Sequence, residues 1–274
     1  MIAEARRLAL KFAWSNPDNA RVAPQLRGLP TCVQNMPPQP VFPTLPTGVM
    51  ASGLRRGGLG LHLVLWSLVA ALLLLRADGG RAWDANRMLQ AAQAAGPRAL
   101  NAVRVLQQVL QSVNGTDDEA QLAAVNQFFN RQVIFTDDML VWGVVDHWAS
   151  PIETLAKGRG DCEDYAIAKY FSLLALGMPT AKLRLVYVRV QTGGAAQAHM
   201  VLAYYPSPQA EPMVLDNLIT DIRPASRRPD LTPVFSFNSD GLWQGTAGAS
   251  AGDPTVRLSR WREVLAKVRE EGFL

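Results

Sequence analysis

Cys162 is the residue of this sequence best suited to nucleophilic chemistry, because a helix is predicted to begin there. It lies in the segment Gly-Arg-Gly-Asp-Cys-Glu-Asp-Tyr at 158–165. Apolar residues then recur at helical spacing until Gly177 and Pro179, so Asp161 is expected to cap the helix and Cys162 to lie in its first turn. The positive end of the helix dipole favours a thiolate, which is the nucleophilic form of cysteine. A cysteine considered alone is more often a small buried apolar residue.

Two polar residues farther along the chain would complete a site around such a cysteine. His199 lies on a strand predicted at 198–205, and Asp216 follows a strand predicted at 213–215. A histidine can accept the thiol proton and later return it to a leaving amine. A carboxylate can hold the imidazole ring and stabilise its charged form. We therefore predict Cys162, His199 and Asp216 as catalytic residues, with the last two at the ends of neighbouring antiparallel strands.

Each of these assignments has an alternative in ordinary structure. His199 could be a hydrogen-bonded strand histidine, and His147 competes with it, although His147 is flanked by apparent packing residues. Asp216 could merely open a turn, as Asp and Asn often do. Asn217 could instead orient the histidine. Because strand alternation lets only one of the two neighbours face His199, we favour Asp216.

Three carboxylates, those of Asp161, Glu163 and Asp164, surround the cysteine in the sequence. Acidic residues in a first turn stabilise the helix dipole, and Asp164 also resembles half of a capping box. Carboxylates beside a thiol nevertheless disfavour the thiolate. A hard cation such as calcium would neutralise them, and carboxylate oxygens are its natural ligands. The spacing of an EF-hand is not present, so from these residues alone helix capping is the simpler interpretation.

The first 80 residues differ in composition from the rest of the chain. The run 59–75 contains no Asp, Glu, Lys or Arg and follows Arg55 and Arg56. Counted from Met50, residues 50–80 are predicted to be a signal peptide, and counted from the first residue they would be a short membrane anchor. We expect translation to start at Met50, and the proline-rich residues 1–49 to be a disordered extension or not translated at all. Residues 81–274 are then an exported domain.

Charge and cysteine content narrow the possible functions. Of 27 Lys and Arg and 23 Asp and Glu residues, eight basic and three acidic ones lie in 1–80, which leaves 19 and 20 in the exported domain. The excess positive charge therefore belongs to the leader, and no nucleic-acid partner is expected. Cys32 and Cys162 lie on opposite sides of the apolar run, so no disulfide between them is expected. A single cysteine in an exported domain is expected to be there for its chemistry.

The exported domain is predicted to contain helices first and strands later. Helical patterns cover 84–95, 97–113, a segment capped by Thr116 or Asp117, 152–157 and 257–270. An irregular segment with a short strand is expected at 130–142. Alternating patterns predict strands at 183–190, 198–205 and 213–215, with a hairpin loop at 191–197. This order predicts an α+β fold with N-terminal helices packed on an antiparallel sheet.

Several multi-residue motifs occur in order between about residues 83 and 244. They are Phe128 to Asn130, Trp142-Gly143, Asp146 to Pro151, Gly160 to Tyr170, Ala198 to Leu202, Leu215 to Leu218, Pro224 to Ser226 and Pro233 to Asn238. In this order they resemble the bacterial transglutaminase-like cysteine peptidases of the LapG type. The resemblance implies a papain-like or transglutaminase-like fold. Cys162, His199 and Asp216 match the catalytic triad of that family, and Asp161 and Glu163 match its calcium ligands.

The resemblance also implies a biological role. Such a protein is a calcium-dependent periplasmic endopeptidase that cuts the N-terminal region of a large cell-surface adhesin, typically at paired alanines, and thereby controls biofilm attachment. An inner-membrane receptor for cyclic di-GMP sequesters the protease. Exposed aromatic residues near Trp142 and Trp148 are candidates for the receptor contact. Whether Asp164 also binds calcium is left open.

Two alternative functions use the same fold. A thioester formed on Cys162 could be captured by a lysine amine, as in a transglutaminase. The domain could also be a non-catalytic binding module. The presence of Cys162, His199 and Asp216 together argues against a module that has lost catalysis.

Overall fold

The computed structural model describes residues 83–246 and 250–274. The predicted extension 1–49, the predicted signal peptide or anchor at 50–80 and Cys32 lie outside the described residues. The expectations about the start of translation, export and a disulfide between the two cysteines therefore stay predictions. None of the helices in the described part is long and apolar enough to cross a bilayer.

Three helices open the described region, namely α3 (Ala85–Ala95), α4 (Pro97–Ser112) and α5 (Asp118–Gln132). The carboxylate of Asp84 caps α3 by accepting hydrogen bonds from two backbone amides. Gly96, with φ of 111°, ends α3 in a conformation that favours glycine, and Pro97 begins α4. The predicted break at Gly96-Pro97 is confirmed, and Asp117 is the N-cap of α5.

The segment before the central helix contains two short helices and a minimal sheet. These are α6 (Asp138–Val141), α7 (Pro151–Lys157), and strands β1 (Ile134–Phe135) and β2 (Arg159–Gly160), which pair in parallel. Ser150 and Glu153 form a capping box at the start of α7, and Pro151 is its first residue, one position before the predicted range 152–157. Gly158, with a left-handed φ of 59°, ends it. The one-turn helix α6 was not predicted.

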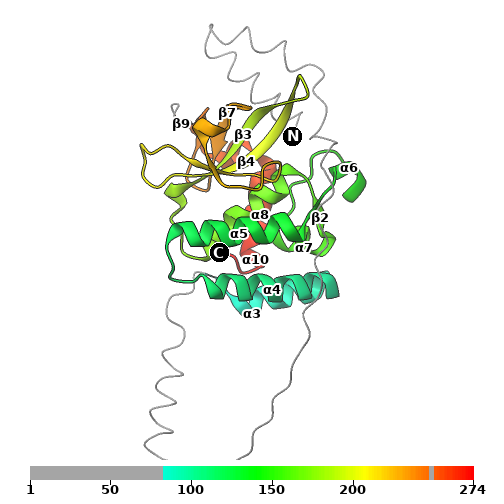
Figure 1. Cartoon of the computed structure of the whole chain (residues 1–274). Helices are drawn as coiled ribbons and strands as arrows, with labels where there is room; N and C mark the ends of the chain where they lie inside the picture. Colours follow the sequence, from blue (N-terminus) through cyan, green and yellow to red (C-terminus); the bar gives the residue numbers. More distant parts are fainter. Residues whose placement is uncertain (1–82, 247–249) are drawn as a thin grey trace, which may run out of the picture. The chain divides into compact units, whose positions relative to one another are not determined.

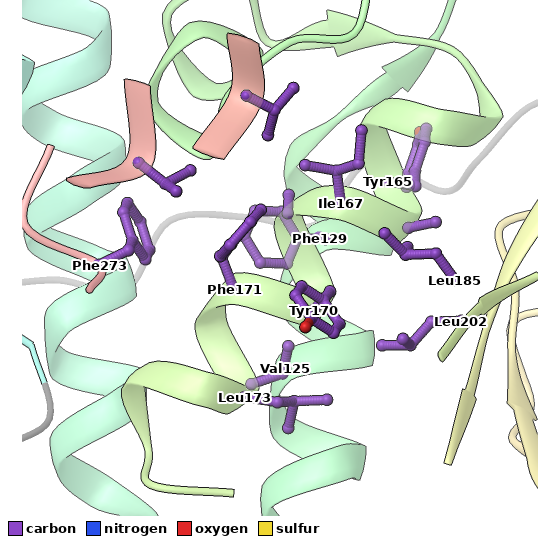
Figure 2. Packing of buried hydrophobic residues seen from close by; sticks show 14 of the residues in the cluster. Val125, Phe129, Tyr165, Ile167, Tyr170, Phe171, Leu173, Leu185, Leu202 and Phe273 are labelled. Atoms are coloured by element: carbon purple, nitrogen blue, oxygen red, sulfur yellow. The ribbon is translucent and has the colours of Figure 1, made fainter. Parts of the chain in front are cut away.

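Helix α8 (Cys162–Ala175) lies at the centre of the domain. Every residue of it except Leu174 is buried, so it has no solvent face. It contacts α5 and α7 on one side and strands of the main sheet on the other. Figure 2 shows Tyr170 of α8 on the side of the strand residues Leu185 and Leu202, and Phe171 on the side of Phe129 and Phe273. The predicted helix start at Asp161 and Cys162 is confirmed.

A seven-stranded sheet covers α8, and all its neighbouring strands are antiparallel. Its order is β6-β5-β4-β3-β7-β8-β9. The strands are β3 (Leu183–Thr192), β4 (Ala195–Tyr204), β5 (Met213–Leu215), β6 (Arg223–Pro224), β7 (Leu231–Phe237), β8 (Leu242–Gln244) and β9 (Ser250–Gly252). Figure 1 shows the sheet on one side of α5 and α8, with α3 and α4 on the other side. The predicted α+β fold is confirmed.

One prediction about the strands is wrong in detail, and several strands were missed. The hairpin loop expected at 191–197 is only the turn Gly193-Gly194, because the β3–β4 ladder continues to the pair Thr192 and Ala195. Both glycines have positive φ, which a two-residue hairpin turn requires. Strands β6 to β9 were not predicted at all.

The chain returns to the helical layer at its C-terminal end. The predicted helix 257–270 is two helices, α9 (Pro254–Arg257) and α10 (Ser259–Glu270), separated at Leu258. Trp261 of α10 is fully buried and stacks on Phe171 of α8, with ring centroids 5.4 Å apart. Phe273 is also fully buried. The C-terminal helix therefore completes the core around α8.

Candidate active site

Cys162 is the first residue of α8, and its side chain is fully buried. Asp161 is the N-cap, and its backbone amide donates to Oδ2 of Asp164 over 3.3 Å. The turn before the cysteine requires glycine at Gly160, because a Cβ there would lie 2.5 Å from Oδ2 of Asp164. Sγ of Cys162 lies 3.0 Å from Oε2 of Glu163. The local sequence thus fixes the cysteine at the N-terminus of a rigid helix.

His199 and Asp216 are in direct contact. His199 lies on β4 opposite Val188 of β3, and its side chain is 1% exposed. Asp216 follows β5, which pairs with β4 through Leu202 and Leu215. This pairing brings Nε2 of His199 to 2.7 Å from Oδ1 of Asp216. Because Nε2 is engaged, the ring nitrogen left for a further partner is Nδ1.

Asp216 is held by groups from four parts of the chain. Its Oδ1 also accepts hydrogen bonds from the backbone amides of Asn217 and Leu218, at 2.7 Å and 3.2 Å. Its Oδ2 lies 2.7 Å from Nη1 of Arg228, at ion-pair distance but without an aligned N–H. Its backbone carbonyl accepts from Nδ2 of Asn130 and Nζ of Lys169. Burial would raise the pKa of Asp216, but His199 and Arg228 outweigh it and hold that pKa well below its usual range.

Asn217 and His147, the alternatives to Asp216 and His199, lie in other surroundings. Asn217 is buried, but neither Oδ1 nor Nδ2 of its side chain has a hydrogen-bond partner among the described residues. Asp216 rather than Asn217 therefore contacts His199. His147 stacks on Trp142, with ring centroids 4.1 Å apart, and its Nε2 lies 3.8 Å from Oε2 of Glu153.

The structure joins the predicted residues in two groups. His199 pairs with Asp216, whereas Cys162 lies with Asp161 and Glu163. Within the described residues no hydrogen bond joins Cys162 to His199. Hydrogen bonds between catalytic groups are often long without substrate and shorten in the substrate complex. A catalytic role for both residues therefore requires that the sulfur of Cys162 and the ring of His199 come within hydrogen-bond distance in the substrate complex.

Four acidic residues form a buried cluster beside the cysteine, which we call the acidic cluster. Asp161, Glu163 and Asp164 come from the start of α8, and Asp138 comes from the start of α6. Ligand atoms of Asp138, Asp161 and Asp164 lie within 4.8 Å of one another, and so do those of Asp161, Cys162 and Glu163. The sequence predicted Asp161 and Glu163 and left Asp164 open. It missed Asp138, because nothing in the sequence links a residue in an irregular segment to a helix 23 positions later.

The loop before α7 holds two members of the acidic cluster. The backbone amide of Ala149 donates to Oδ1 of Asp164 over 2.9 Å. The backbone amide of His147 donates to Oδ2 of Asp138. One oxygen each of Asp138, Asp161 and Glu163 has no hydrogen-bond partner among the described residues. Buried carboxylate oxygens without partners are energetically costly, so this cluster calls for a positively charged ligand.

The electrostatics of the acidic cluster lead to the same conclusion. Burial and the neighbouring carboxylates raise the pKa of Asp161 and Asp164 well above the usual range. Burial is also the main cause that raises the pKa of Glu163 to about 8 and that of Asp138 to about 6. None of the described Lys or Arg residues forms an ion pair with these four. A set of hard oxygen donors at close range fits calcium.

The two tryptophans that the sequence suggested as receptor contacts differ in exposure. Trp148 is buried, which corrects the expectation that it is exposed. Its ring stacks on Phe237, with centroids 5.6 Å apart, and its indole N–H donates to Asp146. Trp142 is half-buried between His147 and Nζ of Lys157, which lies 4.6 Å from its ring centroid. Trp142 is therefore the more accessible of the two, and the receptor contact stays a prediction.

A cysteine at the start of a buried helix, packed under an antiparallel sheet that carries a histidine–aspartate pair, is the arrangement expected of a transglutaminase-like cysteine proteinase. Residues 101–230 match the sequence model of the family described as bacterial transglutaminase-like cysteine proteinase. The chain belongs to this family, and the predicted resemblance is confirmed. A comparison with curated proteins finds no match.

Solved structures support the same assignment. EGTA-treated LapG from Legionella pneumophila is 37% identical, with a TM-score of 0.60, over 67% of this chain and 97% of that one. Calcium-bound LapG from the same organism is 36% identical, with a TM-score of 0.59, over 68% of this chain and 99% of that one. This chain therefore resembles a protein whose structure has been solved both with calcium and after treatment with EGTA.

Proposed function

We propose that this protein is an exported, calcium-dependent cysteine endopeptidase that cleaves the N-terminal region of a large surface adhesin and so controls biofilm attachment. The observation that carries the proposal is the contact of 2.7 Å between Nε2 of His199 and Oδ1 of Asp216, on the sheet that packs on the helix begun by Cys162. This is the arrangement that a thiol protease needs, and the family membership supports the same class.

In the proposed reaction the sulfur of Cys162 attacks the carbonyl carbon of the scissile peptide bond, and His199 takes the thiol proton. Amides of the first turn of α8 can stabilise the oxyanion that forms. Breakdown of this intermediate releases the amine with the proton from His199 and leaves a thioester on Cys162. His199 then takes a proton from water, whose oxygen attacks the thioester. The carbon–sulfur bond breaks, the acid is released, and the proton returns from His199 to the sulfur of Cys162. Asp216 holds the ring and stabilises its charged form.

The acidic cluster is the proposed calcium site, with Asp138, Asp161, Glu163 and Asp164 as its protein ligands. The unpartnered buried oxygens of Asp138, Asp161 and Glu163 and the calcium-bound relative support this assignment. Bound calcium would neutralise the carboxylates that otherwise disfavour a thiolate at Cys162.

The proposed location is the periplasm, reached through the segment 50–80, which could also remain as an inner-membrane anchor. The proposed regulator is an inner-membrane receptor for cyclic di-GMP, as the resemblance to the LapG type implies. Four apolar side chains on α6 and the loop after it are exposed and give such a receptor a surface to contact beside Trp142. They are Met139, Leu140, Val144 and Val145.

The test of the proposed function is cleavage of a purified adhesin N-terminal fragment that contains a pair of alanines. The intact protein is expected to cut this fragment when calcium is present, and N-terminal sequencing of the released piece should place the cut at the pair. Cys162→Ala should abolish cleavage, because it removes the sulfur that forms the thioester. Cleavage by Cys162→Ala at the rate of the native protein would contradict the mechanism. Stable incorporation of a labelled amine into the fragment would instead assign acyl transfer.

A further inference from the structure

Arg228 is a buried arginine placed directly behind the histidine–aspartate pair. It follows the 3-10 helix η4 (Ala225–Arg227) and precedes β7, and its side chain is 1% exposed. Placing a guanidinium in the interior is costly unless it is paired with a negative charge. Arg228 has two such partners, because its guanidinium lies 2.7 Å from Oδ2 of Asp216 and 2.7 Å from Oδ2 of Asp230.

The two carboxylates hold the guanidinium from different sides. Nε of Arg228 donates to Oδ1 of Asp230 over 3.0 Å, while Nη2 donates to Oδ2 of the same residue. This fork fixes the plane of the guanidinium. Nη1 is the nitrogen that remains, and it lies beside Asp216. The partly exposed Asp230 thus orients Arg228, and Arg228 in turn faces the buried Asp216.

The two carboxylate oxygens of Asp216 face different partners. Oδ1 faces His199, and Oδ2 faces Arg228. A carboxylate whose second oxygen is held by a rigid cation cannot rotate about its Cβ–Cγ bond without losing that ion pair. The other charged groups around Asp216 are Lys169, which binds its backbone carbonyl, and Asp230, which acts through Arg228. Neither contacts the Asp216 carboxylate, so Arg228 is the described side chain that sets its orientation from behind.

We propose that Arg228 is a positioning residue of the protease, which fixes the Asp216 carboxylate so that Oδ1 points at Nε2 of His199. The proposal rests on the proposed function, in which Asp216 and His199 serve Cys162. Arg228 does not touch substrate in this scheme and acts only through Asp216. Its loss should therefore lower the rate of the chemical step and leave substrate binding unchanged.

The first measurement is kcat and KM of Arg228→Met on the adhesin fragment with calcium present. Loss of this close, buried ion pair should lower kcat by roughly 10- to 100-fold, with KM within about twofold. Arg228→Lys keeps the charge but not the fork and should recover part of kcat. The matched control is Arg223→Met, because Arg223 lies on β6 and pairs with the exposed Asp221. That variant should keep the native kcat.

The second measurement is a double-mutant cycle with Asp216→Ala, which tests whether Arg228 acts through Asp216. In the Asp216→Ala background, Arg228→Met should cost less than about twofold in kcat. An equal loss of kcat in both backgrounds would show a general structural effect and overturn the proposal. So would an unchanged kcat in folded Arg228→Met.

Folding of each variant is checked by thermal unfolding. If Arg228→Met does not fold, Asp230→Asn replaces it, since this change loosens the fork but leaves Arg228 beside Asp216. A fall of kcat without a change in KM supports the proposal, and a native kcat overturns it. Cys162→Ala distinguishes a failure of the proposed function from a failure of the proposed role of Arg228. Cleavage by that variant removes the proposed function, whereas an inactive Cys162→Ala beside a fully active Arg228→Met removes only the role of Arg228.

Discussion

At the scale of single residues, Lys169 shows how a charged side chain can be part of the core. It lies on α8 and is fully buried, and its Nζ donates to the backbone carbonyl of Asp216 over 3.1 Å. Tyr165 lies one turn earlier, with its ring centroid 5.6 Å from Nζ. Burial lowers the pKa of Lys169 to about 7, although the charge of Asp216 opposes that change.

This lowered pKa predicts how stability depends on pH. Between about 7 and the ordinary value of 10.5, the unfolded chain binds a proton at Lys169 that the folded protein has lost. Stability should therefore rise with pH in this window, by up to about 1.4 kcal/mol per pH unit from this one group. Lys169→Met lacks the titrating group and should lack this part of the slope.

The measurement is urea unfolding of the native protein and of Lys169→Met at several values of pH above neutrality. Other groups that titrate in the same window contribute to both proteins, so the difference between the two slopes isolates Lys169. Parallel pH dependences would mean that the lysine titrates alike in the folded and unfolded states. Lys157→Met is a matched control, because Nζ of Lys157 lies over the half-buried Trp142 near the protein surface.

At the scale of elements, the acidic cluster joins α6 to the start of α8. A ligand that binds only the folded protein raises its stability, by about 2.7 kcal/mol at one hundred times its dissociation constant. Calcium should therefore raise the Tm of the native protein. Asp138→Asn removes the one cluster carboxylate that α6 supplies and should shift the calcium dependence of Tm to higher concentrations.

Asp137→Asn is the matched control for this experiment. Asp137 is the N-cap of α6 and accepts a hydrogen bond from the amide of Met139, outside the acidic cluster. Asparagine caps helices as well as aspartate does, so this variant should show the native response to calcium. Equal responses in Asp138→Asn and Asp137→Asn would exclude Asp138 as a ligand. The same assay with magnesium tests whether the site prefers the larger cation.

The elements also show what the sequence could predict. Helix α8 was predictable because a capping residue, a long apolar run and Gly177 define its start and its end. Strands β3 and β4 were predictable over most of their length, from the strand patterns at 183–190 and 198–205, whereas their ends beside the two glycines were not. Strands β6, β8 and β9 contain two or three residues each, which is too short for a period of two to be visible. Strand β8 pairs with the seven-residue β7, while β6 and β9 extend the sheet from the three-residue strands β5 and β8.

Strand β7 was missed for a different reason. It contains Pro233, and a proline within a run argues against a strand in the middle of a sheet. In the structure Pro233 lies opposite Val188, next to a register shift between Tyr187 and Val188. Such an irregularity accommodates a residue that cannot donate to the ladder. The contact of Arg228 with Asp216 was equally hidden, because β6 and η4 lie between the two residues in the sequence.

At the scale of the whole molecule, the C-terminal segment ties the helical layer together. The carbonyl of Gly272 accepts a hydrogen bond from the amide of Asp84 over 2.8 Å. The carboxylate of Glu271 accepts from Ser150 and from the amide of Ile152, at the start of α7. Phe273 packs in the core that contains α8, as Figure 2 shows. The C-terminal residues 271–273 thus support the helices that surround the candidate active site.

The prediction at this scale concerns Phe273. Phe273→Ala should lower the free energy of unfolding by about 3 kcal/mol, because it leaves a cavity in a packed core. Leu274→Ala is the matched control, since Leu274 is 44% exposed and should cost less than about 0.5 kcal/mol. Urea unfolding measures both. Equal stabilities of the two variants would show that the C-terminal segment does not contribute to the core.

Because α8 has no solvent face, almost every position along it is constrained by packing, and its first turn also carries Cys162 and part of the acidic cluster. Such a helix has no side on which substitutions can accumulate without consequence. Divergence among related proteases should therefore spare this helix, and new substrate preferences should arise in the connections between strands. An engineer who wishes to redirect the enzyme would begin with those connections and leave the helix untouched.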